Sequence, residues 1–389
     1  MIMRKIFYRF MGKISGKMKF SKQQWKAVNA ILHCRTPALG GEVKKCDHCG
    51  KTETKYRSCR NRHCPVCQAE QARKWLEKEK KKLLPVHYFH VVFTFAEELN
   101  EVFRYNKRLL YGLLFTISAE TMQTFFRDPK YFGAQGGFLS VLHTWGQCLP
   151  FHPHIHMIVP NGAVDAQGNW VLPRKNKHAN KFLFPVKAIS LVFRGKLLQA
   201  LERLHRKGKL RFPSKQAQDA FPDTLRIAAR KRWQVYAKRP FAGPEQVLNY
   251  LARYTHRVAI SEQRILSIQK DSVTFTYKDY RDHAQRKTMT LEGSEFIRRF
   301  LQHVLPPHFR KIRTYGWQQG AQLKQKLPKL REWFAKKAQF AHCLSALLQR
   351  LEAPTKDYVP HCKQCKTGEL YVIEELLPQR GSPTKLSYG

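Results

Sequence analysis

Two histidines separated by a single residue, His154 and His156, could bind a metal ion in this 389-residue chain. They lie in the apolar run 151–159, which predicts a strand. Side chains alternate along a strand, so both imidazoles point to one face, and Ile155 and Met157 point to the other, toward a core. Such a pair is half of a metal site. Because half-buried histidines are also common in strands, the interpretation needs further ligands.

His143 is the candidate third ligand, eleven residues before His154 and near the end of the preceding predicted strand. If the two strands pair as a hairpin, His143 meets His154 and His156 from the side. Three histidines leave positions open for a substrate oxygen, as a catalytic metal requires. Three imidazoles by themselves favour a softer ion such as Zn²⁺ or Mn²⁺.

Cysteines form a second group of candidate ligands, because Cys46-x2-Cys49 and Cys64-x2-Cys67 stand 14 residues apart. Two such pairs are typical of a zinc ribbon, since each pair offers two thiolates from one tight turn. The remaining ligand candidates nearby could hold a second zinc with a fourth ligand from either His33 or His48; they are Cys34, Cys59 and His63.

A last pair, Cys362-x2-Cys365, stands alone near the C-terminus. One pair cannot close a zinc site, so a metal there would need His361, Cys343 or another chain.

Charge is the most unusual property of the composition. The chain has 71 Lys and Arg against 28 Asp and Glu, a formal net charge of +43 that is spread along its whole length. Such a field attracts a polyanion, and nucleic acid is the commonest one. No apolar run reaches the roughly 20 residues of a membrane span. The N-terminus lacks the apolar core of a secretory signal, so we expect a reducing compartment in which the cysteines are thiols or metal ligands.

The elements that position the histidines follow a β-α-β-β order. Strands are predicted at 86–95, 138–144 and 154–159, with a helix over 98–126. Gly136-Gly137 is predicted to interrupt the secondary structure before the second strand. This order fits an antiparallel, ferredoxin-like palm.

Later segments extend this pattern. Basic residues 171–232 predict a helical insertion, and 233–238, 260–268 and 273–277 predict strands. Helices are predicted from Pro244 to Tyr254, at 296–304 and around 333–351. Tyr250 and Tyr254 would share a face of the first of these, since they are four residues apart, although such tyrosines usually serve packing.

We therefore predict an α+β fold, in which a ferredoxin-like antiparallel palm with a helical insertion follows a small zinc-ribbon-like domain. The predicted divisions are a basic N-terminal arm at 1–24, a zinc-binding and DNA-binding domain at 25–72, a catalytic domain at 73–320 with the insertion at 171–232, and a basic C-terminal region at 321–389.

Several motifs together resemble one protein family, the two-tyrosine, HUH-type rolling-circle transposases of bacterial insertion sequences. They are Cys34-Arg-Thr-x-x-Leu-Gly-Gly, Ser58-Cys-Arg-Asn-Arg-His-Cys-Pro, His90-Val-Val-Phe-Thr, His143-Thr-Trp-Gly-Gln with the following His-Pro-His-Ile-His, Tyr250-Leu-Ala-Arg-Tyr and Ile312-Arg-Thr-Tyr-Gly.

The resemblance implies metal-dependent DNA nicking and strand transfer through a 5′-phosphotyrosine. It implies metal ligands at His154 and His156, nucleophiles at Tyr250 and Tyr254, and an N-terminal zinc domain. The third ligand is His143, with Gln147 as the alternative. The catalytic metal is then Mg²⁺ or Mn²⁺.

The expected partner is DNA, namely the single-stranded ends of the chain's own insertion element. Arg253 and Arg257 would hold it through phosphates, with further basic and aromatic candidates at Arg310, Arg313, Tyr315 and Trp317. We expect a bacterial, cytoplasmic, nucleoid-associated protein without a nucleotide cofactor.

Three other functions remain open at this point. A plasmid replication initiator or relaxase would use the same chemistry on another substrate, a three-histidine metallohydrolase would cut through a metal-bound water, and a zinc-ribbon protein would bind DNA without catalysis.

Overall fold

The computed structural model describes residues 1–16, 18–174, 183–238, 259–280, 282–337, 345–347 and 361–379. The chain forms two compact units, each assembled from separate segments. The cysteine unit comprises Met1–Gln71, Ile260–Val304 and Ala353–Gly389, and the histidine unit comprises Ala72–Ala259 and Leu305–Glu352. The division predicted from the sequence consists of consecutive segments, whereas each of these units combines segments that are distant in the chain.

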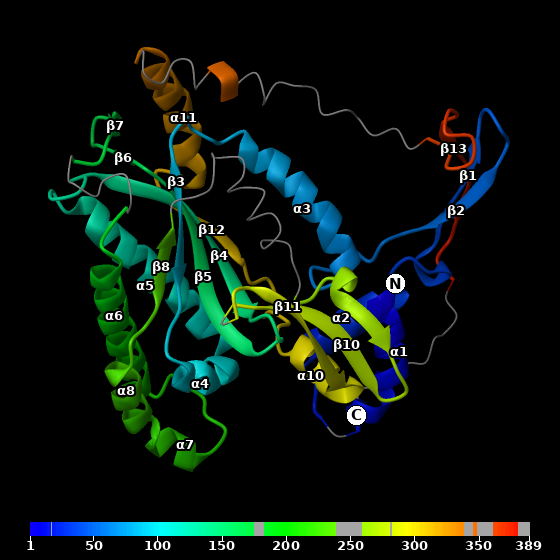
Figure 1. Ribbon diagram of the computed structural model, residues 1–389, viewed down its shortest axis with the longest axis horizontal. Coiled ribbons are helices and arrows are strands. Elements are labelled where there is room, and N and C mark those ends of the chain that lie inside the picture. The colour runs from blue at the N-terminus through cyan, green and yellow to red at the C-terminus, as the bar shows by residue number, and fades with distance from the viewer. Residues whose placement is uncertain are drawn as a thin grey trace. The chain divides into compact units, whose positions relative to one another are not determined.

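The histidine unit is built on an antiparallel sheet with strand order β7-β6-β4-β5-β3-β8, in which β12 also pairs with β4 (Figure 1). Its strands are β3 (Tyr88–Phe93), β4 (Gln135–Trp145), β5 (Phe151–Pro160), β6 (Ala163–Val164), β7 (Trp170–Val171), β8 (Val235–Lys238) and β12 (Ile312–Gly316). Its helices are η2 (Glu97–Leu99), α4 (Asn100–Tyr105), α5 (Lys107–Arg127), α6 (Val186–Arg206), α7 (Lys215–Asp219), α8 (Phe221–Arg230) and α11 (Gly320–Ala335). The predicted β-α-β-β order and the antiparallel sheet are confirmed.

The central strands alternate between two apolar cores. Ile155 and Met157 of β5 join the core that α5 and α6 cover, as the alternation predicts. Ile158, on the opposite face, packs with Leu139 in a second core that includes Trp317. Both faces of the sheet carry packed side chains, which makes the strands rigid supports for the histidines, and these lie on the same face as Leu139 and Ile158.

Gly136 and Gly137 do not interrupt the secondary structure as predicted, because both lie inside β4. They are needed there for close approach. A Cβ on Gly136 would stand 2.1 Å from the Phe126 ring, and one on Gly137 would stand 2.5 Å from the Trp317 indole. The two glycines therefore admit aromatic side chains against the backbone of the strand.

The cysteine unit contains two small antiparallel sheets, with strand orders β13-β1-β2 and β11-β10-β9. Its strands are β1 (Gly41–Cys46), β2 (Thr52–Tyr56), β9 (Ile265–Ile268), β10 (Ser272–Asp279), β11 (Gln285–Glu292) and β13 (Leu370–Leu376). Its helices are α1 (Ile2–Ser15), α2 (Lys22–His33), η1 (Pro37–Leu39), η3 (Glu262–Arg264) and α10 (Gly293–Leu301), while α3 (Pro65–Lys80) begins in this unit and ends in the other.

The N-terminal segment is more structured than the basic arm predicted from sequence. Its residues form α1, whose apolar side is buried against α2 and α10. Phe7 of α1 meets Phe300 of α10 edge to face, with ring centroids 5.6 Å apart. The buried positions recur every three or four residues, and the basic residues between them occupy the other side of the helix.

Candidate metal centres

Three histidines meet on one face of the sheet in the histidine unit. His143 of β4 lies directly opposite His154 of β5 in the strand register, and His156 lies opposite Val141. The ligand nitrogens of all three lie within 4.8 Å of one another. The predicted hairpin therefore brings the third histidine to the pair. Gln147, the alternative ligand, lies in the turn that joins β4 to β5.

Burial keeps two of these imidazoles, those of His154 and His156, neutral at pH 7. It lowers the pKa of His154 to about 3 and holds the pKa of His156 well below its usual range. Neutral imidazole is the form that binds a metal, because a ring nitrogen must offer its lone pair. Among the described residues, the group contains no carboxylate. A divalent cation held here would keep its full positive charge for an anionic ligand from outside.

Hydrogen bonds select the nitrogen that two of these rings present. His154 Nδ1 donates to the carbonyl oxygen of His152 at 2.7 Å, which leaves Nε2 of that ring with its lone pair. His156 Nδ1 lies 2.8 Å from Nε2 of His90, a residue of β3. When His156 donates in this bond, its Nε2 also becomes a ligand atom. The pKa of His90 is lowered by burial to about 4, so that ring is neutral and can accept.

Sequence reasoning assigned no role to His90. The available signal was its position in a predicted strand within a motif shared with the family, but the register that sets it beside His156 comes from tertiary pairing of β3 with β5.

The predicted tyrosines and arginines cannot be placed beside this group. Tyr250, Arg253, Tyr254 and Arg257 all lie outside the described residues.

Trp317 is not a surface for stacking DNA bases, because its side chain is fully buried against Trp170. Arg313 packs its guanidinium 4.3 Å from the centroid of the Phe115 ring, and Tyr315 packs on Phe138. Arg313 and Tyr315 are only partly buried by this packing, so contacts of these two residues with single-stranded DNA stay a prediction.

The cysteines form two groups of four in the cysteine unit, and their pairing differs from the prediction. One group is Cys34, Cys59, Cys64 and Cys67, and the other is Cys46, Cys49, Cys362 and Cys365. The two C-x-x-C turns expected to share one zinc therefore belong to different groups. Neither group contains His63, His33 or His48.

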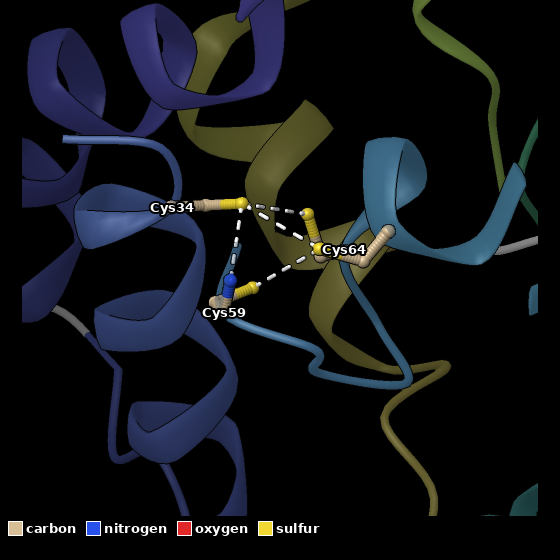
Figure 2. A group of neighbouring side chains, drawn as sticks. Cys34, Cys59 and Cys64 are labelled. Atoms are coloured by element: carbon tan, nitrogen blue, oxygen red, sulfur yellow. Dashed lines mark hydrogen bonds between the residues drawn. The ribbon is translucent and has the colours of Figure 1, made fainter. Parts of the chain in front are cut away.

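The first group gathers thiols from three places in the chain. Cys34 ends α2, Cys59 follows β2 and Cys64 precedes α3, as Figure 2 shows. Cys67 lies in the first turn of α3. Sulfur atoms are 3.6 Å apart between Cys34 and Cys67 and 3.7 Å apart between Cys34 and Cys64. Four sulfurs around one zinc, each about 2.3 Å from it, stand about 3.8 Å apart, so the group fits a tetrahedral Zn²⁺.

Acid–base properties of the first group agree with metal binding. A hydrogen bond from the Cys59 thiol lowers the pKa of Cys34 to about 7. The pKa of Cys67 is held far below its usual range by hydrogen bonds from the other three thiols, first that of Cys34. The same network of hydrogen bonds raises the pKa of Cys59 and of Cys64, in each case first through the Cys34 thiol. The four sulfurs therefore share protons, and zinc would displace those that remain when it binds.

No helix in the described part of the chain is both long and apolar enough to cross a lipid bilayer.

Comparison with known proteins gives matches over most of the chain. Residues 137–326 match a family described as "Putative transposase" (Y2_Tnp), and residues 3–95 match one described as "Transposase zinc-binding domain" (Zn_Tnp_IS91). The first range includes all three clustered histidines, and the second includes the whole first cysteine group.

Two relatives match over most of their length. The chain is 42% identical over 362 residues to "Putative transposase y4qJ" of Sinorhizobium fredii, which covers 91% of this chain and 90% of the relative. It is 29% identical over 310 residues to the transposase for insertion sequence element IS801 of Pseudomonas savastanoi pv. phaseolicola, covering 79% and 73%. No solved structure matches the chain significantly. The chain belongs to the family of insertion-sequence transposases that carry an IS91-type zinc-binding domain.

Proposed function

We propose that this transposase nicks single-stranded DNA at the ends of its own element and transfers the strand through a 5′-phosphotyrosine. The observation that carries the proposal is a group of three histidines without a carboxylate, within the described residues of a chain from a transposase family. Burial holds two of them, His154 and His156, in the neutral form. Three neutral ligands leave a bound cation with its positive charge, which suits the phosphate of a DNA backbone.

His143, His154 and His156 would hold Mg²⁺ or Mn²⁺. When bound, the ion would draw electron density from the scissile phosphate and so assist attack by a phenol, which has a pKa of about 10 and is a poor nucleophile at pH 7. His90 and the carbonyl of His152 would keep the rings of His156 and His154 in the orientation that presents Nε2.

The proposed nucleophiles are Tyr250 and Tyr254. Attack by a tyrosine oxygen on phosphorus forms a P–O bond and breaks the bond to the 3′ oxygen, which leaves as a 3′-hydroxyl after taking up a proton. One phosphodiester replaces another, so rejoining requires no nucleotide. Two tyrosines would allow two broken strands to be held at once, and Arg253 and Arg257 would contact the phosphates.

The test uses a single-stranded oligonucleotide that carries the terminal sequence of the element, with Mg²⁺, with Mn²⁺ or with EDTA. We expect a protein–DNA band that survives denaturation and depends on the metal. Replacing both Tyr250 and Tyr254 with Phe should abolish the band. Tyr280→Phe, at an exposed tyrosine of the cysteine unit, is the matched control and should leave the band unchanged.

Each alternative has its own outcome in this assay. An undiminished adduct in the double variant would place the nucleophile elsewhere, and cleavage without any adduct would indicate a metal-bound water. No cleavage, with DNA binding unchanged after His154→Ala and His156→Ala, would indicate a binding protein. Mobilisation of a DNA segment flanked by the element's own ends separates a transposase from a replication initiator.

A further inference from the structure

The second cysteine group joins two turns from opposite ends of the chain that are built alike. Cys46 and Cys49 lie in the turn after β1, and Cys362 and Cys365 lie in the turn before β13. In the first turn, the N–H of Gly50 donates to the carbonyl oxygen of Cys46 at 3.1 Å.

The C-terminal turn repeats this arrangement. The N–H of Lys366 donates to the carbonyl oxygen of Cys362 at 2.8 Å. The residue after the second cysteine is left-handed in both turns, with φ of 70° at Gly50 and 62° at Lys366. A non-glycine residue rarely adopts this conformation, so its occurrence at Lys366 shows that the C-terminal turn has the same backbone shape as the turn that ends at Gly50.

The two turns face each other through their sulfur atoms. Cys46 Sγ lies 3.7 Å from Cys365 Sγ, and Cys49 Sγ lies 3.6 Å from Cys362 Sγ. These distances are far longer than the bond of about 2.05 Å in a disulfide and match the edge of about 3.8 Å expected around a tetrahedral zinc. All four sulfurs lie within 4.8 Å of one another, as in the first group.

The backbones of the two turns also contact each other directly around the sulfurs. The N–H of Asp47 donates to the carbonyl of Glu369 at 3.1 Å, and the N–H of Glu369 donates to Asp47 Oδ1 at 2.9 Å. A Cβ on Gly368 would stand 2.4 Å from Cys46 Sγ, so only glycine allows this approach. The N–H of Gly368 also donates to Cys365 Sγ at 3.3 Å, and this contact is the largest cause that lowers the pKa of that thiol, to about 5.

A sheet continues from this junction. β13 pairs with β1 in antiparallel register from Leu370 opposite Cys46 to Leu376 opposite Gly41, and Figure 1 shows the red C-terminal strand beside the blue N-terminal one. The matched zinc-binding profile ends at residue 95 and so contains only two of these four cysteines.

We propose that Cys46, Cys49, Cys362 and Cys365 hold a second structural Zn²⁺, which fastens the C-terminal strand to the N-terminal zinc-binding domain. The zinc-binding domain would then be formed by N-terminal and C-terminal segments together. None of its ligands belongs to the histidine unit, so this zinc is a different ion from the one proposed for nicking.

The experiment measures metal content of the full-length protein by mass spectrometry after purification without chelators. We expect two zinc ions per chain, and one in the double variant Cys362→Ser with Cys365→Ser. Cys148→Ser is the matched control, since Cys148 belongs to neither group, and it should retain two ions. One zinc ion in the unmodified chain, two in the double variant, or iron in place of zinc would each overturn the proposal.

Two milder variants guard against a loss of zinc that merely reflects misfolding. Cys362→His keeps a ligand at that position, so two ions should remain, and the thiolate charge-transfer absorption of the cobalt-substituted protein should weaken. Gly368→Ala places a methyl group against Cys46 Sγ, and a chelator should then remove one of the two ions at least about tenfold faster than from the unmodified chain. An unchanged cobalt spectrum in the first variant, or unchanged release in the second, would contradict the assigned ligands.

Discussion

At the residue scale, the histidine site depends on which ring nitrogen each imidazole presents. His154 is fixed by a carbonyl acceptor, whereas His156 depends on another histidine, His90, which can either donate or accept. Only the arrangement in which His156 donates leaves its Nε2 available for a metal. In the proposed metal site, His90 would therefore act as a positioning residue for the ligand His156, without contacting the ion itself.

Replacing His90 tests this role. His90→Ala removes the acceptor, and we expect the dissociation constant for Mn²⁺ at the histidine site to rise about 10-fold to 100-fold, the usual effect of losing such a supporting contact. His90→Gln supplies an amide oxygen that can accept the same hydrogen bond, so affinity should largely return. Isothermal titration with Mn²⁺ measures both.

His87→Ala serves as the control, because His87 is exposed and immediately precedes the same strand. Equal affinity in His90→Ala and the unmodified protein would show that His90 does not orient the ligand.

At the element scale, β4 pairs with three other strands, β5, β12 and β6. Its second half carries His143 opposite β5, and its first half pairs with β12 and β6. The glycines of the first half let Phe126 and Trp317 lie against the strand. The strand that carries the third histidine is thus held by aromatic packing at its far end.

Gly137→Ala should destabilise this strand. The added methyl would collide with the indole of Trp317, which is fully buried and has little room to move. Overpacking of this kind costs about 1–3 kcal/mol of unfolding free energy. Urea unfolding followed by tryptophan fluorescence would report the change.

Gly112→Ala is a matched control, because a Cβ at that helical position meets no atom within 4 Å. It should leave stability unchanged or raise it slightly, since alanine favours a helix. An equally stable Gly137→Ala protein would mean that the indole shifts at no cost.

Local patterns predicted some of these elements and missed others for physical reasons. The hairpin of β4 and β5 was predictable because apolar alternation and a short connection define both its faces and its register. The partners of Cys46 and Cys49 were not, because C-x-x-C turns are chemically interchangeable and only the tertiary fold decides which two meet. Helix α1 was missed because its basic residues obscure an apolar face that becomes evident only against α10.

At the scale of the whole molecule, we expect the net charge of +43 to dominate the proposed interaction with DNA. Charge of this kind binds phosphates without reading sequence, so it should gather DNA before any recognition of the element's ends.

Binding of a single-stranded oligonucleotide of unrelated sequence should therefore weaken steeply with salt. For about 6–10 phosphate contacts on a single strand, we expect affinity to fall about 300-fold or more between 50 and 200 mM salt, because each contact releases a counterion. Fluorescence anisotropy measures this. The Tyr250→Phe and Tyr254→Phe double variant should give the same slope, and a flat salt dependence would refute electrostatic capture.

The pairing of β13 with β1 also has a consequence for how the protein is made. Cys46 and Cys365 are 319 residues apart, and a ribosome adding about 5–20 residues per second needs roughly 15–60 s to cover that interval. During this time β13 has not yet been synthesised, so the edge of β1 that pairs with it has no partner strand. An unpaired strand edge is prone to pair with other chains. The first sheet to be translated is therefore among the last to be completed, and a chain that stops early never acquires its third strand.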